Sequence, residues 1–218
     1  MRSESILSTM TTAFSGPDAA FEWKLLHRFW ESLAQTGAPV SLDTLAQSLA
    51  CERSQIVQVL DEQYPEAEYD PSGNLVGVGL TLRPTTHQIV FENQPFYTWC
   101  APDAFTIPVV LGRPAQIISQ CPVTGTRIEV ALTPEHLEAY TPPGAVVSFA
   151  KHGGMVKRLK EAGCIRQGGC ANQFFFASQE VAAPWVSQHA DFSVFPLEEA
   201  FEDLRKFTQQ QMTLASRA

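Results

Sequence analysis

A change of hydrophobic pattern near residue 80 constrains the fold of this chain more than any other feature. Before it, apolar residues recur at helical spacing; after it, they gather in short runs rich in Ile, Val and Phe that are typical of β-strands. The strand-like runs are 87–92, 115–120, 126–132, 145–150 and 173–178, and the helical segments between and after them are 104–111, 155–162, 182–190 and 197–212. The sequence therefore predicts an α+β fold, with an α-rich domain at 1–80 and an α+β domain of short mixed or antiparallel strands at 81–218.

The N-terminal part has the outline of a winged helix. The first predicted helix covers residues 20–34, Ser41 is the predicted N-cap of the second, and a third carries apolar residues between 56 and 60. A strand, a turn and a second strand are predicted over 69–78. Residues 1–19 are rich in Ser and Thr without periodicity, and are predicted to be a loose tail.

The charge of this part argues against DNA binding. Residues 20–65 contain three basic side chains against six acidic ones, and the whole chain has a formal net charge of -8. A recognition helix without Lys or Arg offers little to phosphates, and an acidic surface is repelled by nucleic acid and by anionic membrane. We therefore expect a scaffold or lid in this part, and no nucleic-acid partner.

The cysteine usage and the lack of apolar spans indicate the compartment. No run of about 18 apolar residues is present, so no membrane span or membrane partner is expected. The N-terminal residues lack the apolar core of a secretory signal, and the five cysteines are an odd number. These features favour reduced thiols and a cytoplasmic location.

The stretch around Cys100 is the first candidate for chemistry. Cys100 and Asp103 are three residues apart, and Pro102 between them suits the start of a helix. On one side of a first helical turn their side chains can touch. A thiolate is a nucleophile and a soft-metal ligand, and a carboxyl can take and return its proton. The alternative is a buried small cysteine beside a helix-capping aspartate.

Two further cysteines flank a glycine-bearing loop. Cys164 and Cys170 enclose residues 165–169, close to several Lys and Arg side chains that are expected to lower a thiol pKa. Cys170 directly precedes the apolar run that contains Phe174–Phe176, so it should be fixed at a strand edge. Cys170 is the stronger candidate for a reactive thiol.

The remaining motifs carry less information. Cys121 opens a turn between two predicted strands, where a structural role is favoured over metal binding. Residues 133–136 resemble a capped helix start. The histidines show no zinc spacing, and no C-x-x-C, P-loop, G-x-G-x-x-G or G-x-S-x-G motif occurs.

Five segments of the chain form a specific pattern when taken together. They are Glu68-Tyr69-Asp70 with Gly73-Asn74, Gly77-x-Gly79-Leu80-Thr81-Leu82-Arg83, Tyr97-x-Trp99-Cys100-Ala101-x-Asp103, Cys121-x-x-Thr124-Gly125, and Cys170 with Phe175-Phe176-Ala177-Ser178. With them the chain resembles the bacterial organomercurial lyases (alkylmercury lyases), collinearly from about Phe21 to the C-terminus. The resemblance implies an active site of Cys100, Asp103 and Cys170, and an N-terminal winged-helix-like part that binds no DNA.

The implied reaction is cleavage of the carbon–mercury bond of R–Hg⁺ to a hydrocarbon and Hg(II). Two thiolates hold the soft metal and Asp103 protonates the departing carbon. The product Hg(II) would stay on Cys100 and Cys170, with Asp103 near, until cytosolic thiols or a mercuric reductase remove it. No organic cofactor is expected.

Two departures from the family pattern and two rival functions remain. Ala171 stands where some members carry another cysteine, and Cys164 is an additional thiol that is a candidate mercury ligand. The main rival is a cysteine-based metal-binding or sensor protein with a winged helix and no turnover. A thiol-disulfide enzyme is the second rival, disfavoured because no C-x-x-C is present.

Overall fold

The computed structural model describes residues 5–13, 19–151, 158 and 161–217. Its helices are α1 (Ile6–Ala13), α2 (Ala19–Thr36), α3 (Leu42–Leu49), α4 (Arg53–Gln63), α5 (Ala101–Leu111), the π-helix η1 (Arg166–Cys170), α7 (Gln179–Gln188) and α8 (Leu197–Arg217). Its strands are β1 (Glu68–Tyr69), β2 (Leu75–Val78), β3 (Leu80–Thr81), β4 (His87–Phe91), β5 (Gln94–Thr98), β6 (Ala115–Gln120), β7 (Arg127–Leu132), β8 (Leu137–Thr141), β9 (Val146–Ala150), β10 (Phe175–Phe176) and β11 (Phe192–Pro196).

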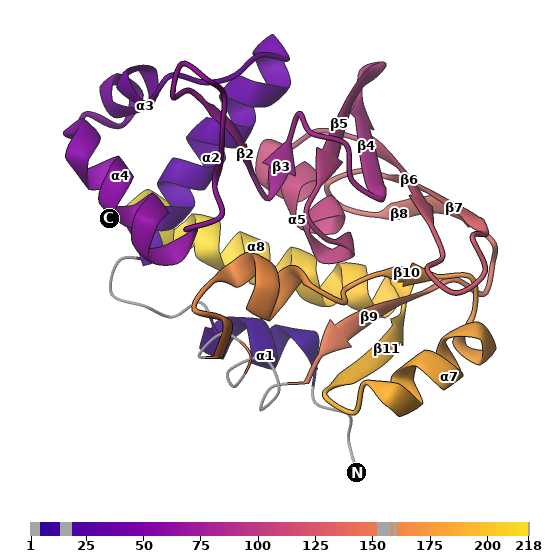
Figure 1. Cartoon of the computed structure of the whole chain (residues 1–218). Coiled ribbons are helices and arrows are strands. Elements are labelled where there is room, and N and C mark those ends of the chain that lie inside the picture. The colour runs from indigo at the N-terminus through magenta and orange to yellow at the C-terminus, as the bar shows by residue number, and fades with distance from the viewer. Residues whose placement is uncertain (1–4, 14–18, 152–157, 159–160, 218) are drawn as a thin grey trace.

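The strands form two antiparallel sheets (Figure 1). The larger sheet has eight strands in the order β1-β2-β3-β5-β4-β6-β7-β8, and the smaller has three in the order β10-β9-β11. Strands β6 and β7 pair without a break from Ala115↔Leu132 to Gln120↔Arg127. The alternating burial along β6 places one of its faces in the core, as the period of two in a strand requires.

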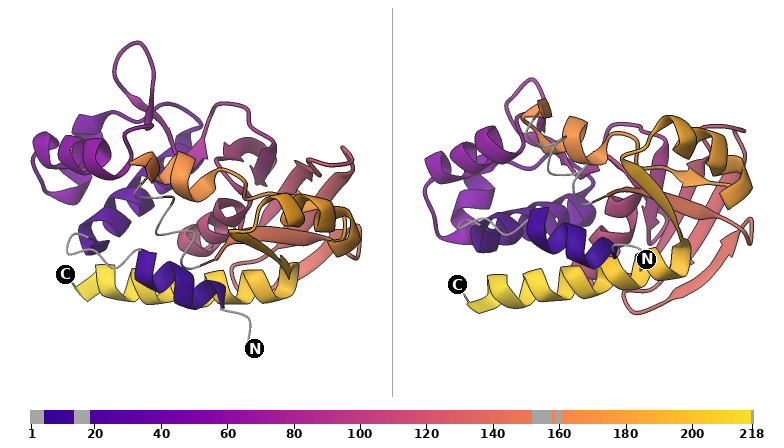
Figure 2. Two further views of the ribbon diagram at one scale, coloured as in Figure 1. Left: turned by 60° about the horizontal axis from the view of Figure 1, so that its bottom comes forward. Right: turned by 90° about the horizontal axis from the view of Figure 1, so that it is seen from below.

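The long helix α8 links the N-terminal helices to the sheets. It contacts α1, α2 and α5 as well as β9 and β11, and it runs along one side of the molecule with α1 beside it (Figure 2). Its apolar residues recur every three to four positions, so one stripe of the helix is buried and the opposite stripe is solvated. On the buried stripe, the ring of Phe207 contacts the ring of Trp23 from α2, with centroids 5.8 Å apart.

Helix α5 is the buried centre of this arrangement. Only Asp103 and Leu111 among its residues are partly exposed, and Gly112 ends the helix in the left-handed conformation, with φ 62°. The side chain of Phe105 is fully buried, and its ring lies 5.4 Å from that of Phe175 in β10 and 5.7 Å from that of Phe201 in α8. Helix α5 is thereby fixed between the smaller sheet and α8.

Most of the secondary structure predicted from the sequence is confirmed, and so is the α+β class. Ser41 caps α3 as predicted, accepting the N–H of Asp43 at 3.2 Å. The predicted strands at 87–92, 115–120, 126–132 and 145–150 correspond to β4, β6, β7 and β9. The predicted helices at 104–111, 182–190 and 197–212 correspond to α5, α7 and α8, and the hairpin at 69–78 corresponds to β1 and β2.

The prediction of a loose tail over residues 1–19 is wrong for its central part. Residues 6–13 form α1, in which Ile6 is 1% exposed and Thr9 2% exposed. The N–H of Leu7 donates to Asp203 of α8 at 3.3 Å. A short Ser- and Thr-rich segment has little helical preference of its own, so packing on α8 provides the stability that its composition does not indicate.

Three further local predictions differ from the structure. Residues 133–136 do not begin a helix: the N–H of Thr133 donates to the carbonyl of His136, and β8 follows. The loop expected at 165–169 is largely the π-helix η1. Strand β5 was not predicted, because Pro95 and polar residues weaken its pattern; a two-residue turn at Glu92 and Asn93, both with positive φ, pairs it with β4.

Two predictions about the chain's organisation stay predictions. The three helices and the hairpin of the proposed winged helix are present. However, β2 pairs with β3 and β3 pairs with β5, so the hairpin is also part of the larger sheet. This arrangement decides neither the winged-helix assignment nor the domain boundary near residue 80. The helix expected at 155–162 falls largely outside the described residues. No helix among those described combines the length and the apolar character needed to span a membrane.

The packing of α5 gives a stability prediction. Replacing Phe105 by Ala leaves a cavity between β10 and α8, so the free energy of unfolding should fall by about 3–5 kcal/mol. Urea unfolding followed by circular dichroism measures this loss. Leu214→Ala in α8 is the control: Leu214 is 54% exposed, and its replacement should change the free energy by less than about 0.5 kcal/mol. Equal losses in the two variants would contradict a core centred on α5.

Candidate active site

The start of α5 positions two of the three predicted site residues. Cys100 is the N-cap of the helix, with an extended backbone, and Asp103 lies in the first turn. The Cys100 carbonyl accepts the hydroxyl of Thr98 at 2.9 Å, and the N–H of Trp99 donates to the carbonyl of Gly79 at 2.8 Å. The ligand atoms of Cys100 and Asp103 lie within 4.8 Å of each other, so the approach predicted from their spacing is confirmed.

The third predicted residue reaches the same place from a distant part of the chain. Cys170 is the last residue of η1, in which the N–H of Gly168 donates to the carbonyl of Cys164 at 3.1 Å. The N–H of Ala101 donates to the carbonyl of Gln173 at 3.1 Å, which joins the start of α5 to the segment that follows η1. Cys170 thus lies beside Cys100, seventy positions earlier in the sequence.

Cys100, Asp103 and Cys170 form a compact cluster. One ligand atom from each lies within 4.8 Å of the others, and among the described residues this is the group of three that fits a metal ion. The Cys170 thiol points to Oδ2 of Asp103 at 4.0 Å. Cys100 is 3% exposed and Cys170 8% exposed, so the two sulfur atoms are almost entirely removed from water.

Burial raises the proton affinity of this cluster. It raises the pKa of Asp103 to about 6, against opposing effects of hydrogen bonds from Cys100 and of the Arg166 charge. Burial also holds the pKa of Cys100 well above its ordinary value, and the contact with Cys170 and the Asp103 charge act in the same direction. For Cys170, a hydrogen bond from Cys100 lowers the pKa, but burial and the charge of Asp103 together raise it. The empty site therefore tends to retain its protons.

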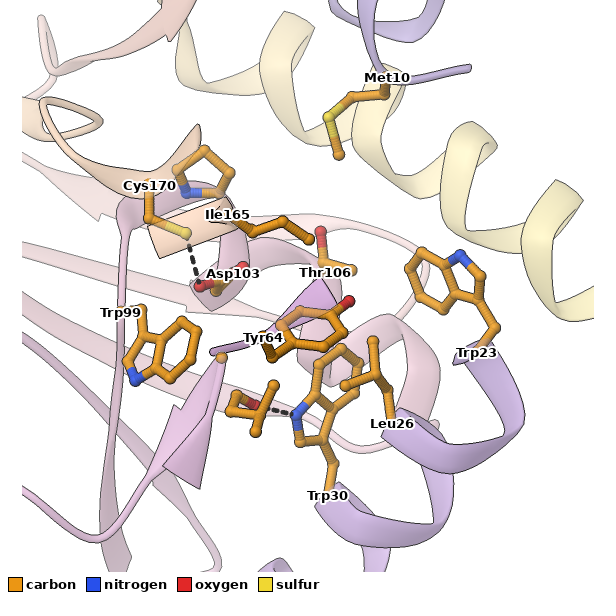
Figure 3. A pocket seen from close by; sticks show the side chains of 13 residues that line it. Met10, Trp23, Leu26, Trp30, Tyr64, Trp99, Asp103, Thr106, Ile165 and Cys170 are labelled. Atoms are coloured by element: carbon orange, nitrogen blue, oxygen red, sulfur yellow. Dashed lines mark hydrogen bonds between the residues drawn. The ribbon is translucent and has the colours of Figure 1, made fainter. Parts of the chain in front are cut away.

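A cavity of about 70 Å³ opens beside the cluster (Figure 3). Cys170 and Asp103 line it, at the side opposite to Trp23, Leu26 and Trp30 of α2. Cys100 does not line it, so Cys170 is the thiol that a molecule in the cavity meets first. The lining is mainly apolar and aromatic, and its other members are Met10, Tyr64, Val78, Gly79, Trp99, Pro102, Thr106 and Ile165.

Among the described residues, Arg166 is a cation that acts on the cluster. The guanidinium of Arg166 forms an ion pair with Glu68 of β1 at 2.7 Å, and lies 4.7 Å from the centroid of the Trp99 ring. Glu68 is buried and also accepts the hydroxyl of Thr81. The charge of Arg166 opposes the rise in pKa at Asp103 and Cys170. These contacts attach η1 to the edge of the larger sheet.

The predicted lowering of the thiol pKa near the basic residues is wrong for both cysteines of this segment. Cys164 is 8% exposed and donates to Glu66 at 3.1 Å; burial is the main reason that its pKa is raised. The basic side chains are engaged elsewhere: Arg166 pairs with Glu68, and Arg158 donates to the carbonyl of Gly168. Lys157 and Lys160, which contributed to the prediction, lie outside the described residues.

Cys121 lies in the turn after β6 and is not part of the cluster. It is 1% exposed. Burial alone would raise its pKa, but hydrogen bonds from the Thr124 side chain and from backbone N–H groups lower the pKa overall. Its sulfur therefore serves as an acceptor within the turn.

The cavity wall contains residues that the sequence did not single out. Tyr64 is buried, lines the cavity and donates its hydroxyl to Glu22 of α2 at 2.5 Å. Trp30 donates to the carbonyl of Val78 at 2.7 Å. A helix face that lines a cavity has the same periodicity as one that fills a core, so the pattern of α2 carries no signal for this role.

Two buried thiols beside a carboxyl define a site for a soft metal ion, because thiolates are the ligands that such ions prefer. The comparison with known proteins specifies this class. The family model for alkylmercury lyase (MerB) matches residues 80–209. The alkylmercury lyase of Streptomyces lividans is 32% identical over 212 residues, which cover 97% of this chain and 95% of that protein.

Other relatives agree with this match. The alkylmercury lyase of Staphylococcus epidermidis is 34% identical over 86% of this chain and 82% of that protein, and that of Pseudomonas putida is 35% identical over 76% and 74%. The solved mercury-bound form of MerB2 shares the fold, with a TM-score of 0.70 over 93% of this chain and 98% of that one, at 22% identity. The chain belongs to the alkylmercury lyase family.

The cavity makes the two thiols unequal toward reagents. Because Cys170 lines the cavity and Cys100 does not, a small thiol reagent such as methyl methanethiosulfonate should modify Cys170 before Cys100. Peptide mass spectrometry after short exposures measures the two rates within one sample. Faster modification of Cys100 would contradict the placement of Cys170 at the cavity surface.

Proposed function

We propose that this protein is an alkylmercury lyase that converts an organomercurial cation R–Hg⁺ into the hydrocarbon RH and Hg(II). The observation that carries the proposal is the convergence of Cys100, Asp103 and Cys170 in a chain of this family. Two thiols supply the soft ligands that mercury prefers, and the carboxyl beside them supplies a means of moving a proton.

Capture of the substrate begins at Cys170. Its sulfur lines the cavity and forms the first S–Hg bond, and its thiol proton passes to Asp103, whose Oδ2 is 4.0 Å away. Because the carboxyl has a pKa of about 6, it can accept and return a proton close to neutral pH. The ordinary aspartate value of about 3.9 would make it a poor proton store at that pH.

Cleavage follows when Cys100 adds the second S–Hg bond and loses its proton to solvent. Two thiolates on mercury push electron density toward the metal-bound carbon. The C–Hg bond breaks as the carbon takes its electron pair and receives the proton held by Asp103. Of the two thiol protons, one thus ends on the hydrocarbon and the other in solvent, and Hg(II) remains on the two sulfur atoms.

The cavity wall suits the organic group. Trp23, Leu26 and Trp30 face the Asp103–Cys170 pair across the cavity, and Tyr64 and Trp99 add aromatic surface (Figure 3). An apolar lining binds a hydrocarbon group and keeps bulk water from the proton donor. This lining and the dithiol therefore recognise the two ends of R–Hg⁺ separately.

The product is Hg(II) held by Cys100 and Cys170 with Asp103 near. Cytosolic thiols or a mercuric reductase would accept this ion, in a cytoplasmic detoxification of mercury. The reaction as written needs no organic cofactor. Nucleic acid has no part in it, in keeping with the acidic side chains of the N-terminal helices.

The thiol pair should be essential for cleavage. Cys100→Ala and Cys170→Ala each remove one S–Hg bond, and both should abolish benzene release from phenylmercury in the presence of excess thiol. Cys51→Ala is the matched control, since Cys51 is outside the cluster and partly exposed, and it should keep nearly full activity. Full activity in Cys170→Ala would exclude the two-thiol mechanism.

Asp103 separates a lyase from a protein that only binds mercury. Asp103→Asn keeps both thiols but holds no transferable proton, so turnover should fall by roughly 10²-fold or more, the usual scale for a lost general acid. Binding of phenylmercury and Hg(II), measured by intact-protein mass spectrometry, should persist. In D₂O the wild-type product should carry one deuteron at the former mercury-bound carbon.

Wild-type rates in Asp103→Asn would show that the proton comes from another group. Binding of phenylmercury by the wild-type protein without any benzene release would instead support a metal-binding or sensor protein. The two results are separable because binding and turnover are measured on the same sample.

A further inference from the structure

Gln173 connects the two segments that carry the thiols. Its carbonyl accepts the N–H of Ala101, the residue after Cys100, at 3.1 Å. Its N–H donates to the carbonyl of Cys170 at 3.1 Å. Its side-chain amide donates to the carbonyl of Gly169. One residue is therefore bonded to both sides of the cluster.

The two ends of the Gln173 side-chain amide are in different situations. The residue is 3% exposed, and within the described part of the chain its buried amide oxygen has no hydrogen-bond partner. A buried acceptor without a partner destabilises the fold, because it loses its hydrogen bonds to water and gains none. The NH₂ group of the same amide donates to the carbonyl of Gly169 in η1, and this hydrogen bond is the interaction that favours a glutamine at this position.

We propose that Gln173 is the positioning residue that fixes the separation of the Cys100 and Cys170 sulfur atoms, and with it the strength with which the pair chelates Hg(II). This inference rests on the proposed function for the identity of the metal. The backbone of Gln173 ties α5 to the turn after η1, and its side chain keeps the end of η1, with Cys170, against that backbone.

The chelate effect links this geometry to a measurable quantity. After the first S–Hg bond forms, the second thiol acts at an effective concentration that depends on its distance and freedom. A competing monothiol removes Hg(II) only after one of the two bonds opens. If the end of η1 is loosened, the second thiol recaptures the ion less often, and a lower concentration of competitor releases it.

Gln173→Met tests this role, because methionine keeps the length of the side chain but has no donor for Gly169. The matched control is Gln167→Met. Gln167 lies in the same π-helix and donates from the same kind of amide, at 2.8 Å, but to Glu66 on its exposed side. Each protein is loaded with one equivalent of Hg(II) and titrated with N-acetylcysteine, and the mercury–thiolate absorbance and the metal retained after desalting are recorded.

The concentration of N-acetylcysteine that removes half of the Hg(II) should fall about tenfold in Gln173→Met, on the scale by which effective concentration changes with geometry. It should stay at the wild-type value in Gln167→Met. Wild-type retention in Gln173→Met would overturn the proposal. An equal fall in both variants would also overturn it, because it would reflect general loosening of η1.

The melting temperature of each metal-free variant confirms that it is folded. If Gln173→Met does not fold, Gln173→Leu decides the question with the same expected fall, since leucine is apolar, has a similar volume and has no donor for Gly169. The titration requires no carbon–mercury cleavage. A wild-type protein that chelates Hg(II) but releases no benzene would therefore refute the lyase proposal and leave the role of Gln173 measurable.

Discussion

The burial of α5 is the constraint on which the rest of the structure depends. Phe105 occupies the space between Phe175 and Phe201, so the helix is held by β10 on one side and α8 on another. A helix that is enclosed so completely cannot rotate or slide without opening the core. Its N-terminal turn is fixed for the same reason, and that turn carries Cys100 and Asp103. The precision of the site thus derives from the hydrophobic packing of the same helix, through Phe105 two residues after Asp103.

The enclosure that fixes the site also decides its protonation. A carboxyl removed from water favours its neutral form, and the pKa of about 6 at Asp103 follows mainly from that burial. The thiols share the same surroundings and hold their protons too. A soft cation reverses this preference, because it offers the sulfur atoms a partner that replaces the proton. Under the proposed function, the cluster therefore exchanges its protons for the metal ion when that ion binds.

The sequence alone allowed prediction of contacts between residues that are close together in the chain. Cys100 and Asp103 share one helical turn, so their proximity follows from three residues of separation. Cys170 joins them through contacts between distant segments, and it was placed at the site by the family resemblance. The rise in its pKa was missed because, against a hydrogen bond from Cys100 that lowers the pKa, it comes from burial and from the charge of Asp103, which only the folded chain brings about. Helix α1 was missed because its stability comes from α8, and the cavity-lining role of Trp30 and Tyr64 was missed because an apolar helix face looks the same in either use.

One part of the cavity wall comes from a different region of the chain than the reacting groups. Met10 belongs to α1 and Leu26 to α2, whereas Asp103 and Cys170 belong to α5 and η1. Under the proposed function, a substitution at Met10 or Leu26 would change the room for the organic group without altering any atom that binds mercury or transfers the proton. Selection on the N-terminal helices can therefore broaden or narrow the range of compounds detoxified, while the dithiol chemistry is inherited unchanged.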